Sequence, residues 1–436
     1  MNVRETALTL LSEIEAQEKY ANLALNSHLL DNLEKKDKRI LTALLYTTVE
    51  HKLTYDYYIG YLSGRNIAEI APRVKNILRL GLCQILDMTS VPDFAAVNES
   101  VKLAKNQGER SFINGVLRRA VREKNELPLP DRNKNIARYL SVKYSYPVGT
   151  VKRFISALGE EDTERLLLAF ENNAYTDITV NTIKITPEEL VERLVAGGYS
   201  ARVHEYSRVT VRIDGSCDPR ELYGFSEGYF FVQDAASAVS ALALNASSGD
   251  RIIDVCACPG GKSFASAILS GDGAEIISFD LHESKLSLIE SGAARLGLGS
   301  IRVGERDATI PDESLFGTAD KVICDVPCSG LGVLAKKPDL RYKDIARAEE
   351  LLALGREILE ASSRYLKVGG VLAFSTCTLE KCENTDTVSS FLREHPEFSP
   401  LEFKVGGLSS KNGELTLYPH IHGTDGFYIA LLGKNG

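Results

Sequence analysis

The sequence predicts an α/β protein of three parts: an all-helical domain over residues 1–130, a small α/β module over 131–240 and a doubly wound, mainly parallel sheet over 241–436. Three observations predict this organisation. Apolar residues recur at helical spacing over roughly the first 125 positions, the segment DITVNTIKI alternates β-branched with polar residues, and apolar runs alternate with amphipathic segments from Asp250 onward. A chain of 436 residues also accommodates several domains, at ~100–200 residues each.

The first domain is predicted from apolar residues that fall on one helix face every three or four positions. This pattern holds at Val3, Ala7, Leu10, Leu11 and Ile14, and again at Leu41, Leu44, Leu45 and Val49. Turn residues are sparse until the segment ELPLPDRN, whose Pro128 and Pro130 indicate a linker. We therefore expect residues 1–126 to be helical.

The second part begins with helical periodicity over residues 136–170, and the alternating segment DITVNTIKI then predicts a strand. Thr186, Pro187 and Glu189 form a helix start, with a capping hydroxyl, a proline at the first helical position and a carboxylate three residues after the cap. The segments SARVHEY, RVTVRI and YFFVQD complete a mixed α/β module.

From Asp250 the chain alternates between strands and helices in the manner of a doubly wound sheet. The expected strands are RIIDVC, EIISFD, SIRVG, KVICDV and GVLAFST, then ELTLY and FYIALL; the expected helices are KSFASAIL, SKLSLIESGAARL and a segment ending at Leu366. We expect the strand order 3-2-1-4-5, and ligands of such sheets bind beyond the carboxyl ends of the strands. Each distinctive motif of this half falls at one of those ends.

Composition excludes several classes of protein. With 44% hydrophobic and 25% charged residues the chain is neither disordered nor collagen-like, and no apolar run reaches the ~18 residues of a membrane span. The N-terminal segment MNVRETALTLLSEIEAQEKY mixes acids with apolar residues and lacks the pattern of a signal peptide. Six of the eight cysteines lie between positions 256 and 382, which is not a disulfide framework. We therefore expect a cytoplasmic protein.

The formal net charge of −8 is unevenly distributed. Residues 1–150 carry 22 basic and 17 acidic side chains, a balance of +5, whereas residues 151–436 carry 29 and 42, a balance of −13. Residues 102–143 alone hold 11 Lys and Arg against four acids. Such a basic stripe on an acidic protein is compatible with RNA binding, but it does not establish it, because a solvated helix face has the same composition. The candidate RNA-binding residues are Arg118, Arg119, Arg122 and Lys124.

A glycine-containing loop, CACPGGKS, follows the first strand of the sheet and leads into a helix, where backbone N–H groups can bind an anionic or hydroxyl-bearing ligand. Gly260 and Gly261 permit close approach of that ligand. A phosphate-binding P-loop requires glycine where Cys256 stands, and the GxGxxG fingerprint is absent, which leaves a plain tight turn as the alternative. The candidate cofactor-binding residues of the loop are Cys256, Ala257, Cys258, Pro259, Gly260, Gly261 and Lys262.

Carboxylates follow the second and third strands. Asp280 stands 20 residues after Gly260, where a carboxylate can accept hydrogen bonds from both ribose hydroxyls of a nucleoside. Asp307 is either a ligand for a base amino group or a turn residue. The loop and Asp280 together predict a cofactor that contains a nucleoside.

Two cysteines lie at the ends of the fourth and fifth strands, in the segments DVPCSG and STCT. Because adjacent strands lie ~4.8 Å apart, we expect Cys328, Cys377 and Asp325 to share one pocket beside the cofactor. The spacings CxC, CxxxC and CxxxxC lie on separate connections and lack the CxxC of structural zinc sites, so no metal is expected. The structural alternative, a small buried apolar side chain, suits Cys83, Cys324 and Cys382.

These motifs resemble those of the NOL1/NOP2/Sun family of RNA cytosine-5 methyltransferases. DVCACPGGK is similar to the family's S-adenosylmethionine loop, DLHESKL to its ribose-binding segment, DVPCSGLGVL to its first cysteine motif and FSTCTLEKCEN to its second, and VQDAAS and DGFYIALL also match. The N-terminal segments YANLALN, DKRILTALLYTTVEHK and SFINGVLRRAV are similar to the antitermination factor NusB. The resemblance implies a Rossmann-like class I methyltransferase domain, preceded by a NusB-like domain and an RRM-like RNA-binding module.

The resemblance also implies the chemistry. Cytosine C5 is a poor nucleophile, so such an enzyme first adds a thiolate to C6. By the resemblance Cys377 is that nucleophile, Cys328 assists removal of the C5 proton and release of the enzyme, and Asp325 hydrogen-bonds the base near N3. Lys262 completes the candidate catalytic residues, and Asp325 also belongs to the cofactor-binding set. In DNA cytosine-5 methyltransferases the nucleophile comes from a Pro-Cys motif, which leaves Cys328 as a rival.

The substrate that the resemblance implies is one cytosine of small-subunit (16S) ribosomal RNA, unstacked so that a thiol can reach C6. The implied cofactor is S-adenosylmethionine, and the protein is expected to be a monomer that uses neither membrane nor metal. Two other functions stay open. Intact Cys328, Cys377 and Lys262 argue against a silent RNA-binding or antitermination module, and Cys256 argues against a nucleotide hydrolase.

Overall fold

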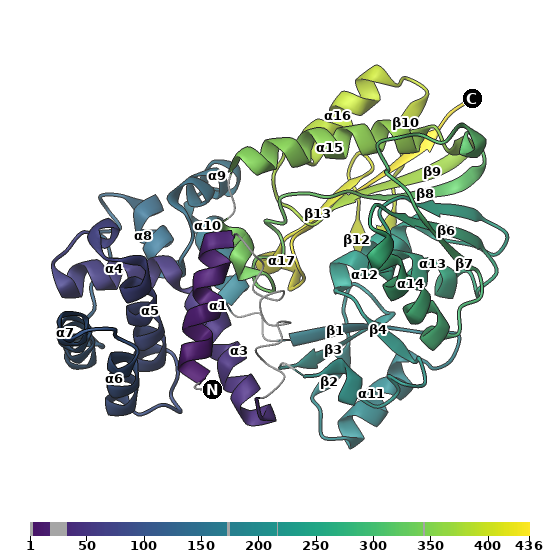
Figure 1. Cartoon of the computed structure of the whole chain (residues 1–436). Helices are drawn as coiled ribbons and strands as arrows, with labels where there is room; N and C mark the ends of the chain where they lie inside the picture. The colour runs from purple at the N-terminus through teal and green to yellow at the C-terminus, as the bar shows by residue number, and fades with distance from the viewer. Residues whose placement is uncertain (1–2, 18–32, 172–174, 216, 343–344) are drawn as a thin grey trace. The chain divides into compact units, whose positions relative to one another are not determined.

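The computed structural model describes residues 3–17, 33–171, 175–215, 217–342 and 345–436 (Figure 1). The chain divides into two compact units, the first comprising Met1–Glu171 with Leu334–Lys343 and the second Asn172–Val333 with Asp344–Gly436. The chain therefore enters the second unit, returns to the first for a short segment and leaves it again. The NusB-like segment YANLALN, residues 20–26, lies outside the described residues.

The first unit is a bundle of helices packed around α5 (Pro72–Leu86), whose residues 76–85 are all buried. Across residues 3–17 and 33–126 the structure shows only helices and turns, as the apolar periodicity predicted. Three helices beyond the Pro128–Pro130 segment also cluster with this unit rather than with the sheet that follows. The helices are α1 (Val3–Gln17), α3 (Lys35–Glu50), α4 (Lys52–Ser63), α6 (Asp93–Lys102), α7 (Gln107–Glu123), α8 (Ile136–Tyr144), α9 (Val148–Leu158) and α10 (Glu160–Glu171), with the 3-10 turn η2 (Ile67–Glu69).

The returning segment carries a 3-10 turn, η5 (Pro338–Tyr342), that packs inside the first unit. The buried Arg341 guanidinium donates to the main-chain oxygens of Glu50 at 3.2 Å and Tyr144 at 3.4 Å, and it pairs with the Glu50 carboxylate at 3.0 Å. Its carbon lies 4.1 Å from the centre of the Tyr146 ring. These contacts satisfy a charge that would be costly to bury alone.

The second unit begins with a four-stranded antiparallel sheet of order β2-β3-β1-β4. Its elements are β1 (Tyr175–Val180), α11 (Pro187–Ala196), β2 (Ala201–Val203), β3 (Thr210–Asp214), η3 (Pro219–Glu221) and β4 (Phe230–Val232). Thr186 and Glu189 form the predicted reciprocal cap of α11. The predicted strand DITVNTIKI stops at Val180, because the buried Asn181 side chain turns to donate to the main-chain oxygens of Gly228 and Leu296.

The larger sheet has the order β10-β14-β9-β8-β5-β6-β7, with β13 paired to β14. Strands β7, β6, β5, β8 and β9 are parallel, which confirms the predicted order 3-2-1-4-5, and β14 is antiparallel to β9. The bounds are β5 (Arg251–Asp254), β6 (Glu275–Asp280), β7 (Ile301–Glu305), β8 (Ala319–Asp325), β9 (Leu366–Thr376), β10 (Phe398–Pro400), β13 (Glu414–Leu417) and β14 (Phe427–Lys434).

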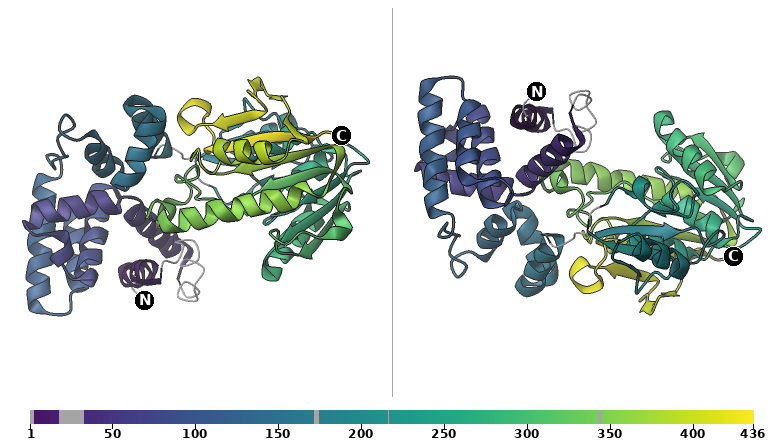
Figure 2. Two further views of the ribbon diagram at one scale, coloured as in Figure 1. Left: turned by 90° about the horizontal axis from the view of Figure 1, so that it is seen from above. Right: turned by 90° about the horizontal axis from the view of Figure 1, so that it is seen from below.

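Helices cover both faces of this sheet (Figure 2). Buried residues of α12 (Ala235–Leu244), α13 (Gly261–Leu269) and α14 (Glu283–Leu296) share one core cluster, and those of α15 (Ile345–Ser363) and α16 (Thr385–Glu394) share another. The prediction that α15 ends at Leu366 is wrong, because Leu366 pairs with Ala319 as the first residue of β9. The remaining elements are η4 (Glu313–Leu315), β11 (Lys404–Val405), β12 (Leu408–Ser409) and α17 (Pro419–His422). In the described parts of the chain, no helix combines the length and apolarity that crossing a bilayer requires.

Candidate active site

A cavity of about 210 Å³ lies at the carboxyl end of β5, where the glycine-containing loop leads into α13. The loop and the end of β8 form one side of it, as the sequence predicted for a ligand site of this sheet. The predicted residues that line the cavity are Cys256, Ala257, Cys258, Pro259, Gly261, Lys262 and Asp325.

Gly260 does not line the cavity but shapes the turn beside it. Its φ of +109° is a conformation that glycine adopts without strain, and a Cβ there would lie 2.4 Å from the ring of Phe264. A Cβ on Gly261 would lie 3.0 Å from the Gln233 amide nitrogen. Gly260 therefore allows the turn to pack against Phe264, and Gly261 leaves room for the Gln233 side chain at the start of α13.

The other wall of the cavity comes from residues that the sequence interpretation did not select. They belong to the VQDAAS segment and to the last residue of β5, and they are Val232, Gln233, Asp234, Ser237 and Asp254. Among the described residues, Gln233 Oε1 and Asp254 Oδ1 are buried side-chain oxygens without a hydrogen-bond partner. Burial is the main cause that raises the pKa of Asp254 to about 7. A polar residue at the carboxyl end of the first parallel strand was the available signal for Asp254.

The two predicted carboxylates beyond β6 and β7 make local contacts. Asp280 ends β6 and accepts a hydrogen bond from the N–H of Cys258 at 3.2 Å, so it supports the loop from outside the cavity lining. Asp307 accepts from the N–H and hydroxyl of Thr309, at 2.9 and 2.7 Å, in the turn after β7. These hydrogen bonds hold the pKa of Asp307 below its usual range.

Lys262 and Asp325 form an ion pair at the cavity. Lys262 Nζ lies 2.5 Å from Asp325 Oδ2 and 3.2 Å from the Ser237 hydroxyl, and it lies 5.0 Å from the centre of the Phe427 ring. The second Asp325 oxygen accepts from the Ser375 hydroxyl at 2.6 Å. The carboxylate at the end of β8 is thus neutralised and fixed in orientation by neighbours on both sides.

Cys328 and Cys377 lie in contact, their sulfurs 3.4 Å apart, just beyond the ends of β8 and β9. The contact with the Cys377 thiol and, after it, burial raise the pKa of Cys328 well above its ordinary value. The Cys328 thiol therefore keeps its proton more readily than an isolated thiol does. The adjacency of β8 and β9 is what brings these sequence-distant thiols together.

Four cysteines lie outside the cavity and the thiol pair, and Cys217 among them is partly buried. Cys83 and Cys324 are buried, and burial raises the pKa of Cys83 to about 12. Cys382 is exposed, so its interpretation as a buried apolar residue is wrong; it lies in the turn before α16, where its side chain meets no core. In the described residues no cluster of His, Cys, Asp and Glu is arranged to hold a metal ion.

Comparison with known proteins assigns this architecture to a family. The family described as 16S rRNA methyltransferase RsmB/F matches residues 241–433, the NusB family matches residues 1–122, and the ferredoxin-like domain of RsmF/B-like methyltransferases matches residues 146–220. The probable ribosomal RNA small subunit methyltransferase B of Bacillus subtilis (strain 168) is 34% identical over 453 residues, which cover 100% of this chain and 99% of the relative. The chain belongs to the RsmB/F family of 16S rRNA methyltransferases.

Further relatives agree with this RsmB/F assignment. The ribosomal RNA small subunit methyltransferase B of Serratia proteamaculans (strain 568) is 30% identical over 441 residues, covering 99% of each chain. The crystal structure of the protein PH0851 superposes with a TM-score of 0.81 at 26% identity, covering 100% of this chain and 99% of that one. The resemblance of the motifs to the Sun methyltransferases and to NusB is thereby confirmed.

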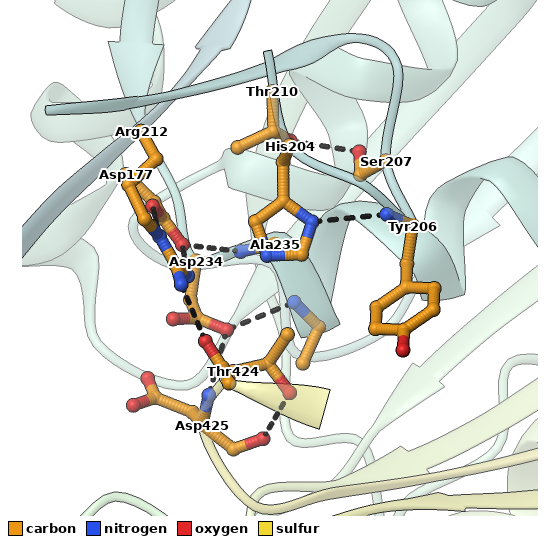
Figure 3. Close-up of polar contacts among 12 residues, drawn as sticks. Asp177, His204, Tyr206, Ser207, Thr210, Arg212, Asp234, Ala235, Thr424 and Asp425 are labelled. Atoms are coloured by element: carbon orange, nitrogen blue, oxygen red, sulfur yellow. Dashed lines mark hydrogen bonds and ion pairs between the residues drawn. The ribbon is translucent and has the colours of Figure 1, made fainter. Parts of the chain in front are cut away.

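In this RsmB/F chain a buried ion pair ties the ferredoxin-like sheet to the cavity wall (Figure 3). Arg212 of β3 and Asp177 of β1 form two hydrogen bonds of 2.7 Å, and Arg212 also donates to the Gly423 oxygen at 2.6 Å. Asp177 accepts from the N–H of Ala235 at 3.3 Å, and its main-chain oxygen accepts from Gln233. The small sheet thus positions the residues from which α12 and the cavity wall begin.

The candidate RNA-binding residues of this RsmB/F chain lie on and after α7 and divide into pairs. Arg118 and Arg122 line an open groove between α6 and α7, together with the exposed ring of Phe94. The other two are held by acids, in the ion pairs Arg119–Glu123 at 2.8 Å and Lys124–Asp93 at 2.7 Å.

Proposed function

We propose that this chain methylates C5 of a cytosine in 16S ribosomal RNA, with S-adenosylmethionine as the methyl donor and through a covalent bond between a cysteine and C6. Family membership supplies the coarser activity, methylation of small-subunit ribosomal RNA. The observation that carries the finer proposal is the contact between two thiols beyond adjacent strands: Cys328 lies three residues after Asp325, the last residue of β8, and Cys377 directly follows β9. Covalent catalysis at C6 needs one thiol to add to the base and a second group to help it leave.

The cavity suits the nucleoside and charged parts of S-adenosylmethionine. The unpartnered oxygens of Gln233 and Asp254 line the cavity and can accept hydrogen bonds from ligand amino or hydroxyl groups. When bound, this cofactor supplies an electrophilic methyl group. We propose that the loop Cys256–Lys262 holds it with Asp280, Asp307 and Asp325, whose carboxylates can accept from such groups.

Cys377 is the proposed nucleophile, because it stands in the segment FSTCTLEKCEN, which resembles the second cysteine motif of the family. The Cys377 thiolate adds to C6, the electron pair of the C5–C6 double bond moves to C5, and N3 takes up a proton from solvent. The Asp325 carboxylate, paired with Lys262, accepts a hydrogen bond from that N3–H group. The electron pair at C5 would then bond to the methyl group as its bond to the cofactor sulfonium breaks, which leaves a neutral thioether. Cys328 loses its own proton to solvent and, as a thiolate, takes the C5 proton. The C6–S bond then breaks, which restores the double bond and frees Cys377.

Transfer of labelled methyl from S-adenosylmethionine to unmodified 16S rRNA tests this proposal, with protein–RNA adducts resolved on denaturing gels. We expect label at cytosine C5 with wild type and with the control Cys217→Ser, which lies outside the site. Cys377→Ala should abolish transfer and adduct, whereas Cys328→Ala should accumulate the adduct. An adduct in Cys377→Ala would reverse the two roles, and no transfer by wild type to rRNA or precursor particles would refute the function.

A further inference from the structure

Each cysteine of the pair is followed by a residue with a side-chain hydroxyl, and these hydroxyls meet. Ser329 Oγ and Thr378 Oγ1 lie 2.7 Å apart. The thiol-bearing loops after β8 and β9 are therefore in contact twice, once through the sulfurs and once through the following side chains. This second contact is closed off from solvent on one side, since Thr378 is fully buried.

Glu383 holds this second contact. One carboxyl oxygen accepts from the Ser329 hydroxyl at 2.6 Å and lies 3.5 Å from the Thr378 hydroxyl, and the other accepts from the Ser329 N–H at 2.8 Å. The Glu383 side chain is buried, and burial raises its pKa. A carboxyl group in this position makes two hydrogen bonds to the residue directly after Cys328.

Asn384 holds the other loop in the same manner. Its amide oxygen accepts from the Thr376 hydroxyl at 2.5 Å, and its amide nitrogen donates to the main-chain oxygen of Thr378 at 3.0 Å. Thr376 and Thr378 are the residues on either side of Cys377. Glu383 and Asn384 are adjacent in sequence, so the fixed geometry of one dipeptide links both thiol-bearing loops.

We propose that Glu383 and Asn384 are positioning residues that set the distance between the thiols of Cys328 and Cys377. Their hydrogen bonds go to Ser329, Thr376 and Thr378, so both act through the residues that flank the cysteines. The spacing matters for the proposed function because Cys328 must act while Cys377 is bound to the base. Misplacing Cys328 by a fraction of an ångström should slow release of the adduct more than its formation.

Oxidation of the thiol pair measures the spacing without RNA or cofactor. With diamide as oxidant, the two thiols give up two protons and two electrons, a Cys328–Cys377 bond forms, and the diamide N=N bond becomes an N–N bond carrying two hydrogens. The rate is followed by loss of free thiol and by mass spectrometry of the linked peptides, in full-length protein. We expect Glu383→Gln and Asn384→Asp to form this disulfide at least about tenfold more slowly than wild type.

The matched control is Glu394→Gln, which changes an exposed carboxylate further along α16 and should oxidise at the wild-type rate. Glu383→Gln removes an acceptor that Ser329 requires. The effects of Glu383→Gln and Ser329→Ala on the rate of disulfide formation should therefore be less than additive when the two are combined. Ser329→Ala alone keeps the measurement informative if a Glu383 variant fails to fold. Oxidation of Glu383→Gln at the wild-type rate, or full additivity with Ser329→Ala, would overturn the proposal.

A second readout rests on the proposed function. In single turnover with 16S rRNA, Glu383→Gln should raise the fraction of enzyme trapped as adduct several-fold and leave the Kd for S-adenosylmethionine unchanged, a split that general destabilisation would not produce. If wild type forms no adduct, the proposed function fails while the oxidation experiment still decides the positioning role. Slower oxidation without a change in trapped adduct would confine that role to the thiol distance and refute its part in release.

Discussion

Asp254 is a buried carboxyl whose protonation affects folding of the methyltransferase unit. Its carboxyl is 1% exposed, and burial raises its pKa to about 7, far above the value of ~3.9 in an unfolded chain. The folded state therefore binds the proton more tightly. The associated stability is complete below about pH 4 and is lost as the pH rises through about 7.

Replacing Asp254 by asparagine removes this titration. We expect the unfolding free energy of wild type to decrease by on the order of 3 kcal/mol between pH 5 and pH 8, which lowers its Tm. The Tm of Asp254→Asn should change less over the same interval. Thermal unfolding of both proteins without ligand checks this. Parallel pH profiles for the two proteins would contradict the assignment of the proton to Asp254.

At the scale of elements, the turn after β8 approaches the start of β14 too closely for any side chain. A Cβ on Gly332 would lie 1.9 Å from the Gly426 oxygen and 2.8 Å from the Cys377 oxygen. Gly332→Ala should therefore separate these strand ends and reduce methyl transfer by at least about 100-fold.

In the helix α7, a Cβ on Gly115 meets nothing within 4 Å, so Gly115→Ala should retain activity and gain about 0.5–1 kcal/mol of stability. Equal activity of the two variants would refute the close-approach argument.

The order of the elements could be predicted from sequence, whereas the contacts between their ends could not. Alternating apolar runs are enough to place Cys328 and Cys377 at adjacent strand ends, because the topology of doubly wound sheets is restricted. Glu383 precedes a helix in the segment EKCENTD, where acids are common for reasons of helix polarity alone. Its partner Ser329 lies 54 residues earlier, and only the fold brings them together.

At the scale of the whole molecule, residues 334–343 lie late in the sequence but belong to the helical unit. Sequence patterns alone could not predict this long-range contact. Arg341→Ala would remove the ion-pair partner of the Glu50 carboxylate and the guanidinium donor to the Tyr144 oxygen, a loss of about 3–5 kcal/mol for a buried pair; the Glu50 main-chain oxygen keeps the Tyr342 hydroxyl as a donor. We expect faster hydrogen exchange in α3 and α8 and unchanged exchange in β5 and β8. Arg364→Ala, which breaks an exposed pair with Glu360 on α15, should cost less than about 1 kcal/mol. Uniform exchange changes across the chain would contradict this localisation.

RNA binding is a whole-molecule problem, because an overall charge of −8 repels RNA while the first 150 residues carry +5. We propose that Arg118 and Arg122, which face the groove beside Phe94, contact phosphates, whereas Arg119 and Lys124 are held by acids. Replacing the first pair by alanine should weaken 16S rRNA binding and reduce the slope of log K against log salt by about 1.4, at ~0.7 per phosphate contact on single strands.

The matched control replaces the second pair, Arg119 and Lys124, by alanine, which removes the same formal charge from the same helix end. Each double variant loses two positive charges, so a long-range effect of net charge on RNA binding should be the same in both. A direct phosphate contact should lower the salt slope only when Arg118 and Arg122 are replaced. Binding titrations at several salt concentrations measure both slopes. Equal slopes for the two double variants would show that the groove makes no phosphate contact of its own.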